Sequence, residues 1–231
     1  MWNGKKKAFT FSFDDGVTQD IRAVDILNKY GLKATFNVNS GLLGLVGELP
    51  NGASTVQHNK VEAHDIRAIY AGHEVAVHTL THPNLTRLSA PTIVRQVEED
   101  RKALSDLVGY DVIGMAYPGG GINHDERVAE TIRKNTPIQY ARTIISTGTF
   151  GLQKTNLFTF HPTTNWDHDR AIALAKAFLE TESNESQLFY IWGHTYEFDM
   201  VDGEWERFEE FCKMIAGRET VYYGTNKEVL L

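Results

Sequence analysis

Short apolar runs recur along the chain and alternate with segments in which apolar residues return every three or four positions. The apolar runs predict strands, and the segments between them predict amphipathic helices. The predicted strands cover residues 7–13, 33–39, 73–78, 112–117, 139–144, 157–163 and 187–193, with a weaker eighth at 220–224. The predicted helices cover residues 18–30, 62–71, 90–108, 124–135, 169–182 and 203–217.

Regular alternation of strand and helix predicts a parallel sheet with helices outside it. Seven or eight such units in 231 residues favour an α/β fold, a single-domain distorted (β/α)7–8 barrel over residues 1–231. An open, doubly wound sheet is the alternative. Residues 41–60 interrupt the alternation with a Gly- and Asn-rich insertion, which we expect to form a loop at the rim of the barrel.

The first predicted strand separates two kinds of residue. In KAFTFSFDD, Phe9, Phe11 and Phe13 share the face that we expect to pack under helices, and small or polar residues ending with Asp14 share the other. Asp14 therefore lies at the carboxyl end of the strand, where (β/α) barrels place their chemistry. Asp15 follows directly. Two readings of this pair are open: a solvated turn, or a division of labour between a metal ligand and a proton acceptor.

Two histidines follow the third predicted strand. His78 and His82 are four residues apart in HTLTHP, and Pro83 disfavours a helix there. With an aspartate from the first strand they form an N/N/O set that leaves a coordination position for water, as in catalytic metal sites. Zn²⁺ is the first expectation, with Co²⁺, Ni²⁺ or Mn²⁺ as alternatives. The other histidines considered are assigned structural roles; these are His58, His64, His73, His124 and His168.

Charge and composition narrow the classes of partner. The formal net charge of −7 argues against a nucleic-acid or anionic-membrane partner and favours a neutral substrate. Cys212 is the only cysteine, so a disulfide within the chain and a cysteine metal site are excluded. No apolar run is long enough for a membrane span or a signal peptide, so we expect a cytoplasmic protein. A secreted protein whose leader had been removed would look the same.

Four motifs carry a resemblance to a known family. TFSFDDG, HTLTHP, MAYPGGG and LFYIWGH, in this order between about residues 7 and 195, resemble those of the NodB-homology polysaccharide deacetylases, carbohydrate esterase family four. The resemblance implies a distorted (β/α) barrel, one divalent metal ion and hydrolysis of acetyl groups from sugars, most often N-acetylglucosamine units. It implies that Asp14 is the general base and His194 the general acid, and that the backbone N–H of Gly119 helps to hold the oxyanion. The implied metal ligands are Asp15, His78 and His82.

The sequence departs from the family pattern at one important position. The family usually has an arginine before the proline motif, paired with the catalytic aspartate, but Ala116 stands there. Arg142, near the end of the next predicted strand, is the candidate replacement. A surface arginine in an outer ion pair is the alternative.

Several aromatic residues are candidates for binding substrate. Trp192 stands where the family tends to have a small aliphatic residue lining the acetyl pocket, and Trp166 matches a hydrophobic patch residue. Tyr117 and His161 are candidates at the rim. Ordinary core packing is the alternative for each aromatic. We also expect an aspartate near Trp166 to orient His194; the candidates are Asp167 and Asp169.

Together these patterns predict a metal-dependent hydrolase that removes acetyl groups from an uncharged carbohydrate. Hydrolysis of another non-peptide amide, such as a cyclic ureide or imide, is the nearest alternative. A carbohydrate-binding protein without catalysis is a third reading, although Asp14 and His194 are both present. The sequence leaves a monomer and a small homo-oligomer equally open.

Overall fold

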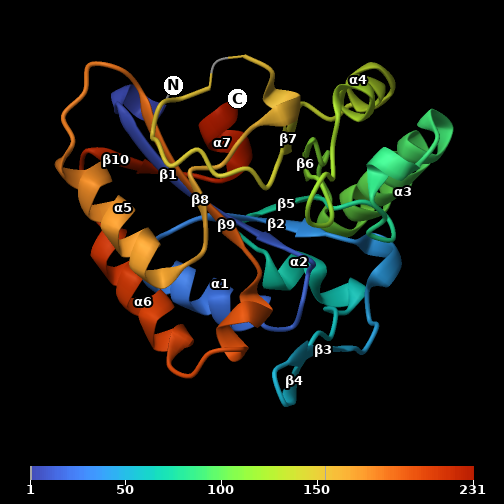
Figure 1. Cartoon of the computed structure of the whole chain (residues 1–231), viewed down its shortest axis with the longest axis horizontal. Helices are drawn as coiled ribbons and strands as arrows, with labels where there is room; N and C mark the ends of the chain where they lie inside the picture. The colour runs from blue at the N-terminus through green and yellow to red at the C-terminus, as the bar shows by residue number, and fades with distance from the viewer. Residues whose placement is uncertain (1, 154) are drawn as a thin grey trace.

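A curled parallel sheet lies at the centre of the structure (Figure 1), a computed structural model that describes residues 2–153 and 155–231. Its strands run in the order β7-β6-β5-β2-β1-β9-β8, and β10 pairs with the start of β1. Among the described residues, the pairings between these named strands are all parallel. The strands are β1 (Lys7–Asp14), β2 (Ala34–Val38), β5 (Glu74–Val77), β6 (Gly114–Ala116), β7 (Tyr140–Arg142), β8 (Thr164–Asn165), β9 (Gln187–Gly193) and β10 (Val221–Tyr223).

Residues 160–165 close the curled sheet into a distorted barrel. The N–H of Phe160 donates to the carbonyl of Ala141 on β7, and the N–H of Thr163 donates to the carbonyl of Tyr190 on β9. The predicted strand over 157–163 is wrong, because a 3₁₀ turn (Leu157–Thr159) replaces its first half. Pro162 has no N–H to donate and so interrupts the ladder. The barrel prediction itself is confirmed.

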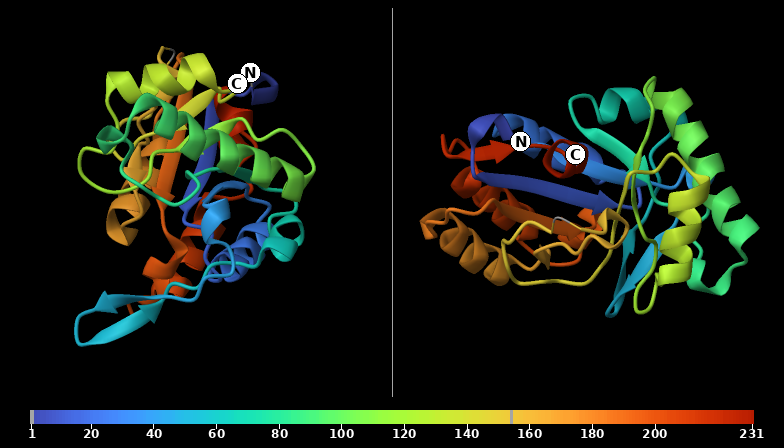
Figure 2. Two further views of the ribbon diagram at one scale, coloured as in Figure 1. Left: turned by 90° about the vertical axis from the view of Figure 1, so that its right-hand side faces the viewer. Right: turned by 90° about the horizontal axis from the view of Figure 1, so that it is seen from above.

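Helices cover the outside of the barrel (Figure 2). They are α1 (Asp20–Lys29), α2 (Ile66–Ile69), α3 (Ala90–Val108), α4 (Glu126–Asn135), α5 (His168–Glu180), α6 (Glu204–Ile215) and α7 (Asn226–Leu230). The predicted helix over 62–71 is shorter than expected, with a 3₁₀ turn (Ala63–Asp65) before α2, and α7 was not predicted. Among the described residues, no helix has the length and apolar character needed to cross a membrane.

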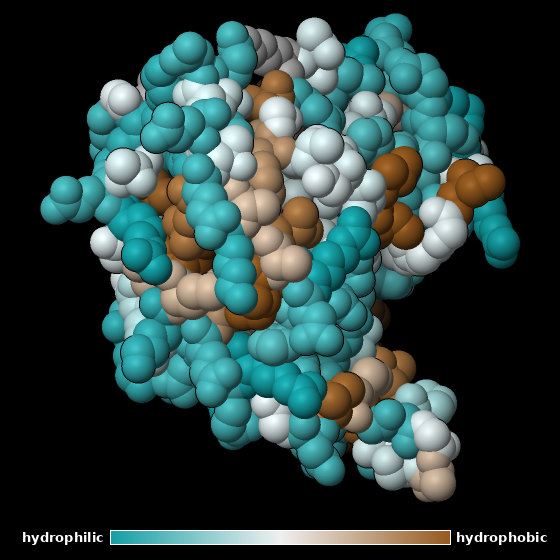
Figure 3. Space-filling model, turned by 60° about the vertical axis from the view of Figure 1, so that its left-hand side comes forward, coloured by the Kyte–Doolittle hydropathy of each residue, from teal (hydrophilic) through white to brown (hydrophobic). Residues whose placement is uncertain are grey.

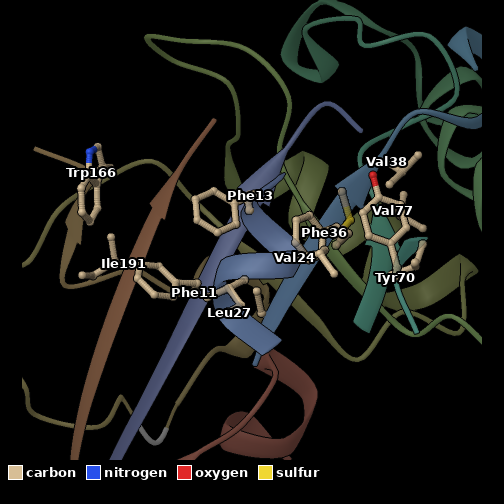
Figure 4. Close-up of a cluster of buried hydrophobic side chains, with 14 of the residues drawn as sticks. Phe11, Phe13, Val24, Leu27, Phe36, Val38, Tyr70, Val77, Trp166 and Ile191 are labelled. Carbon is tan, nitrogen blue, oxygen red and sulfur yellow. The ribbon is translucent and has the colours of Figure 1, made fainter. Parts of the chain in front are cut away.

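The two faces of β1 carry the residues that the sequence alternation predicts, with phenylalanines on one face and small or polar residues on the other. The ring of Phe11 packs 5.5 Å from Phe208 and 5.8 Å from Phe211, both on α6, and stacks 5.4 Å from Phe13. Figure 4 shows Phe11 and Phe13 within this buried cluster, with Trp166 nearby. Each aromatic pair adds about 0.5–1.5 kcal/mol beyond the area that it buries. The cluster fixes β1 against its helices, so the polar face that ends in Asp14 points into the barrel.

The insertion over 41–60 contains a hairpin of β3 (Glu48–Asn51) and β4 (Ser54–Gln57). The hairpin projects from the body beyond the end of the barrel (Figure 2). The chain then returns to the segment that follows β1, where the N–H of Thr18 donates to Asn59 and the N–H of Val61 donates to Gly16. The insertion is therefore attached to the mouth of the barrel at its base.

Candidate metal and catalytic site

Polar side chains from five strands meet at the carboxyl edge of the barrel. Asp14 ends β1, His78 follows β5, Tyr117 follows β6, Arg142 ends β7 and His194 follows β9. A cavity of about 250 Å³ lies at this edge. Its lining residues are Asp14, Asp15, His78, His82, Tyr117, Gly119, Gly120, Ile144, Trp192, His194 and Tyr196.

Asp15, His78 and His82 form a cluster that could hold a metal ion. Asp15 Oδ1 lies 3.5 Å from His82 Nε2 and 3.8 Å from His78 Nε2. This oxygen is buried and accepts no hydrogen bond among the described residues. Burying a carboxylate oxygen without a hydrogen bond costs free energy. Because this oxygen faces two imidazole nitrogens, the three atoms fit the ligands of a bound cation.

The histidine tautomer also suits a metal ligand. His78 Nδ1 lies 3.0 Å from the carbonyl oxygen of Ala116, which can only accept, so Nδ1 carries the proton. Nε2 then keeps its lone pair toward Asp15. Burial lowers the pKa of His78 to about 4, so the ring is neutral at pH 7 and its lone pair is available.

Backbone conformation is unusual at this cluster. Asp15 has φ of +85°, Thr79 of +68° and His82 of +58°, values that residues other than glycine rarely adopt. The side-chain amide of Asn39 donates to the carbonyls of His78 and Thr79 and holds this loop in place. Local strain of this kind gathers at functional sites, where the surrounding structure over-determines the geometry.

Arg142 pairs with Asp14, in the role predicted for a replacement arginine. Its Nη2 donates to Oδ1 of Asp14 at 2.6 Å and also to Oδ2, and both side chains are buried. The guanidinium lies 4.6 Å from the centre of the Trp192 ring. Arg142 is thus held inside the barrel, and the alternative of a surface ion pair is wrong.

The register of β6 and β7 explains how one arginine can replace another. Ala116 on β6 and Arg142 on β7 are direct cross-strand partners. Partners in a parallel pair project to the same face of the sheet, so an arginine at either position can reach the same carboxylate. The arginine that the family usually carries on the strand of β6 is therefore replaced by Arg142 on the neighbouring strand β7, at the position directly across from Ala116.

Asp14 is ionised despite complete burial. Burial raises the pKa of its carboxyl, but the charge of Arg142, the charge of His194 and the hydrogen bond from Arg142 together hold it below the ordinary value. The amide of Asn37, the cross-strand neighbour of Asp14 on β2, donates to Oδ1 at 2.8 Å. Asp15 is also ionised: burial raises its pKa, but the hydrogen bond from His58 and the charges of Lys60 and His194 outweigh burial and lower it.

Glu197, and neither of the expected aspartates, orients His194. His194 Nδ1 lies 3.0 Å from Glu197 Oε1 and donates to it, which leaves Nε2 for proton transfer. Asp167 instead caps α5, and Asp169 lies 3.0 Å from His168. Burial lowers the pKa of His194, but Glu197 and the charges of Asp14 and Asp15 outweigh it, so the pKa lies above its ordinary value.

We expect Glu197→Gln to move the alkaline limb of the pH profile of kcat/KM to lower pH. Without the carboxylate the pKa of His194 falls, so the protonated acid is lost at lower pH. The measurement is kcat/KM for an N-acetyl substrate between pH 5 and 10 (roughly the range of the two limbs). Asp169→Asn is the matched control, and an unchanged alkaline limb in Glu197→Gln would contradict this role.

The loop after β6 brings a backbone donor to the cavity. Gly119 adopts φ of +83°, and its carbonyl accepts from the side chain of Asn123 at 2.8 Å. Among the described residues, no acceptor takes the N–H of Gly119. A free N–H on a glycine that lines the cavity is the geometry that an oxyanion donor needs.

Of the four residues predicted to bind substrate, two line the cavity and two do not. Trp192 and Tyr117 line the cavity, although the hydroxyl of Tyr117 is tied to the carbonyl of Phe158. Trp166 is a core residue, because it packs among the phenylalanines under β1 and its Nε1 donates to Glu204. His161 is paired with Thr143 at 2.7 Å and is not among the cavity-lining residues.

Four residues that contact the site were not among the sequence-predicted site residues. Glu197 stands three residues after His194, a spacing typical of the first turn of a helix. Asn37 was visible as a polar residue on the inward face of an apolar strand. His58 and Lys60 reach Asp15 from the insertion, with His58 Nε2 3.0 Å from Oδ2 and Lys60 Nζ donating to the carbonyl at 2.8 Å. The purely structural role assigned to His58 therefore needs correction.

Comparison with known proteins gives consistent matches. A family model described as polysaccharide deacetylase matches residues 2–140, more than half of the chain. The chain is 30% identical over 128 residues to the peptidoglycan-N-acetylglucosamine deacetylase PgdA of Listeria monocytogenes, covering 54% of this chain and 24% of that protein. It is 34% identical over 118 residues to the chitooligosaccharide deacetylase of Rhizobium leguminosarum bv. phaseoli, covering 49% and 40% respectively. The chain thus spans less than half the length of these relatives.

A solved structure shows the same fold over nearly the whole chain. The Xyl-CE4 domain of a multidomain xylanase from the hindgut metagenome of Trinervitermes trinervoides superimposes with a TM-score of 0.58 at 19% identity, covering 97% of this chain and 89% of that one. The family match and the shared barrel agree with the four sequence motifs. The chain belongs to the polysaccharide deacetylase family.

Proposed function

We propose that this protein is a metal-dependent hydrolase that removes acetyl groups, N-acetyl groups first, from a carbohydrate such as an N-acetylglucosamine oligomer or polymer. The observation that carries the proposal is that the adjacent aspartates Asp14 and Asp15 face different partners. Asp14 is paired with Arg142, whereas Asp15 presents to two histidines an oxygen that accepts no hydrogen bond among the described residues. Two like charges at neighbouring positions thus have separate partners and can perform separate tasks.

A single divalent cation fits the ligands offered by Asp15, His78 and His82. One carboxylate oxygen and two imidazole nitrogens suit Zn²⁺ best among common divalent ions, with Co²⁺, Ni²⁺ or Mn²⁺ as alternatives. When bound, the cation would supply Lewis-acid polarisation of the acetyl carbonyl and acidify a water molecule.

The side chains around the cavity perform the proton transfers. Asp14, ionised and aligned by Arg142, takes the proton as water attacks the acetyl carbon. The N–H of Gly119 donates to the developing oxyanion, a contact worth about 3 kcal/mol where a single donor has been removed from other enzymes. His194, protonated and held by Glu197, gives its proton to the leaving amine. An amine leaves poorly without this proton, so the acid matters most for amide substrates.

Metal addition is expected to raise the thermal stability of the chelator-treated protein. At a metal concentration about 100 times Kd, ligation stabilises the folded state by about 2.7 kcal/mol. For a chain of this length that corresponds to a rise in Tm of roughly 5–10 °C. His82→Ala should abolish most of the rise, because His82 is one of the three ligands and is only partly buried. A full rise in His82→Ala would contradict the proposed ligand set.

A panel of substrates tests the proposed reaction. Metal-reconstituted protein is incubated with chitooligosaccharides, peptidoglycan fragments, acetyl-xylan and small cyclic ureides, and released acetate and ring opening are measured. Acetate from N-acetyl sugars supports the proposal, and acetate from acetyl-xylan alone would restrict it to O-acetyl groups. Ring opening of ureides without acetate release would replace it with amide hydrolysis on small rings. No turnover of any substrate by metal-loaded protein would favour a binding role without catalysis.

Three wider predictions belong to this proposal. Residues 1–231 act as one catalytic domain, the protein is a monomer or a small homo-oligomer, and it works in the cytoplasm without a nucleic-acid or membrane partner. The net charge of −7 supports the exclusion of polyanionic partners. Light scattering of the purified protein tests the oligomeric state, and fractionation of the source cells tests the location.

A further inference from the structure

The insertion over 41–60 reaches the candidate metal site from outside the barrel. The chain returns from the hairpin alongside the segment after β1, where Val17 and Lys60 form an antiparallel bridge and the N–H of Thr18 donates to Asn59. Figure 3 shows the hairpin projecting from the body at the lower right. Near its far end the side-chain amide of Asn51 donates to the carbonyl of Met200 at 3.0 Å. The insertion is therefore joined to the body at the residues that flank Asp15.

Two side chains of the insertion contact Asp15. His58 Nε2 lies 3.0 Å from Oδ2, and because a carboxylate can only accept, Nε2 carries the proton and donates. Lys60 Nζ donates to the backbone carbonyl of Asp15 at 2.8 Å and lies 3.8 Å from Oδ1. Lys60 is almost completely buried, and the side chain of His58 is 19% exposed.

The two oxygens of Asp15 thus have different surroundings. Oδ2 is held by His58, whereas Oδ1 is buried, accepts no hydrogen bond among the described residues and faces His78 and His82. The hydrogen bond to Oδ2 fixes the rotation of the carboxylate, and this rotation decides where Oδ1 points. Asp15 itself has a backbone conformation that is strained for a residue other than glycine, so it needs such outside support.

We infer that His58 is a positioning residue that orients the metal ligand Asp15, with Lys60 of the same insertion holding its backbone. This inference rests on the proposed metal site. Partners that hydrogen-bond a ligand set its orientation, and their removal commonly weakens metal binding by roughly 10- to 100-fold. Here that support comes from the insertion, so the rim segment and the metal centre are coupled.

His58 is assigned to positioning and not to ligation on geometric grounds. Its Nε2 is engaged with Oδ2, the oxygen that does not face the two ligand histidines. Its ring also packs edge-on against Tyr196, with centroids 4.9 Å apart, which fixes it beside the carboxylate. The group that could hold a metal ion among the described residues contains Asp15, His78 and His82 and does not include His58.

The test measures metal affinity directly and does not depend on catalysis. The Kd for Zn²⁺ is determined by competition with a chromophoric chelator for the full chain and three variants. His58→Ala removes the donor, and His58→Gln keeps an N–H donor near the position of Nε2. His64→Ala is the control, because His64 is an exposed histidine outside the site. Circular dichroism of each metal-free variant shows whether the barrel is folded.

We expect His58→Ala to bind Zn²⁺ roughly 10- to 100-fold more weakly, and His58→Gln and His64→Ala to stay within about threefold of the unaltered protein. Equal affinity in His58→Ala would overturn the inference. Equal loss in His58→Ala and a folded His58→Gln would also overturn it and make His58 a fourth ligand. Absence of Zn²⁺ binding by the unaltered protein would instead contradict the proposed metal site.

Discussion

Replacing Asp14 with asparagine is expected to lower kcat for acetate release by roughly 100- to 10,000-fold, the range that a positioned acid–base group contributes. Asparagine keeps the shape of the side chain but cannot take a proton from the attacking water. The metal ligands are untouched, so the metal content of the variant should equal that of the unaltered protein. Acetate release at fixed metal loading is the measurement.

The Asp14→Asn variant also leaves the guanidinium of Arg142 buried without its counter-charge. Some loss of Tm is therefore expected, and activity has to be compared at a temperature where the variant is folded. Asp25→Asn, on the exposed face of α1, is the matched control and should retain full activity. Full activity in folded Asp14→Asn would remove Asp14 from the role of base.

Replacing Arg142 with alanine should have the largest effect on stability. Breaking a buried ion pair by removing one partner costs about 3–5 kcal/mol, because the other charge stays buried without compensation. The bond to Arg142 also helps to hold the pKa of Asp14 below its ordinary value, so that pKa should rise in the variant. The base is then protonated up to a higher pH, and the acidic limb of kcat/KM moves upward.

The cross-strand pairing of Ala116 with Arg142 allows a direct rescue. Ala116→Arg combined with Arg142→Ala returns the arginine to β6, facing the same carboxylate across the space that Arg142 vacates. We expect the double variant to recover part of the lost Tm and to move the acidic limb back toward its original pH. A double variant no better than Arg142→Ala would show that the strand position of the arginine matters, contrary to the register argument.

The sequence predicted those features of the site that depend on local pattern. Alternation along β1 placed the phenylalanines under α6 and Asp14 toward the interior, as the structure has them. The spacing of His78 and His82, together with the acidic pair, predicted the cluster that the structure assembles. The missing arginine at Ala116 made Arg142, near the end of the next predicted strand, the candidate replacement, and the register of β6 and β7 shows why it can serve.

Contacts that form only when a distant segment folds back onto the barrel could not be predicted from the local sequence pattern. The approach of His58 to Asp15 requires the insertion to fold back on the segment after β1, and no local periodicity encodes that path. Residues 157–163 have strand-like composition, yet Pro162 and the 3₁₀ turn divide them, so Phe160 pairs with β7 and β8 starts only at Thr164. The partner of His194 was sought among nearby aspartates, although Glu197 stood at the spacing of a first helical turn.

Acetate release from N-acetylglucosamine oligomers by the metal-loaded protein is the most direct measurement. The expected result is equal amounts of acetate and free amine, lost on chelation and regained when the metal is restored. Intact oligomers after prolonged incubation with folded protein, shown to hold one metal ion per chain at the Asp15, His78 and His82 cluster, would contradict the proposed deacetylase function.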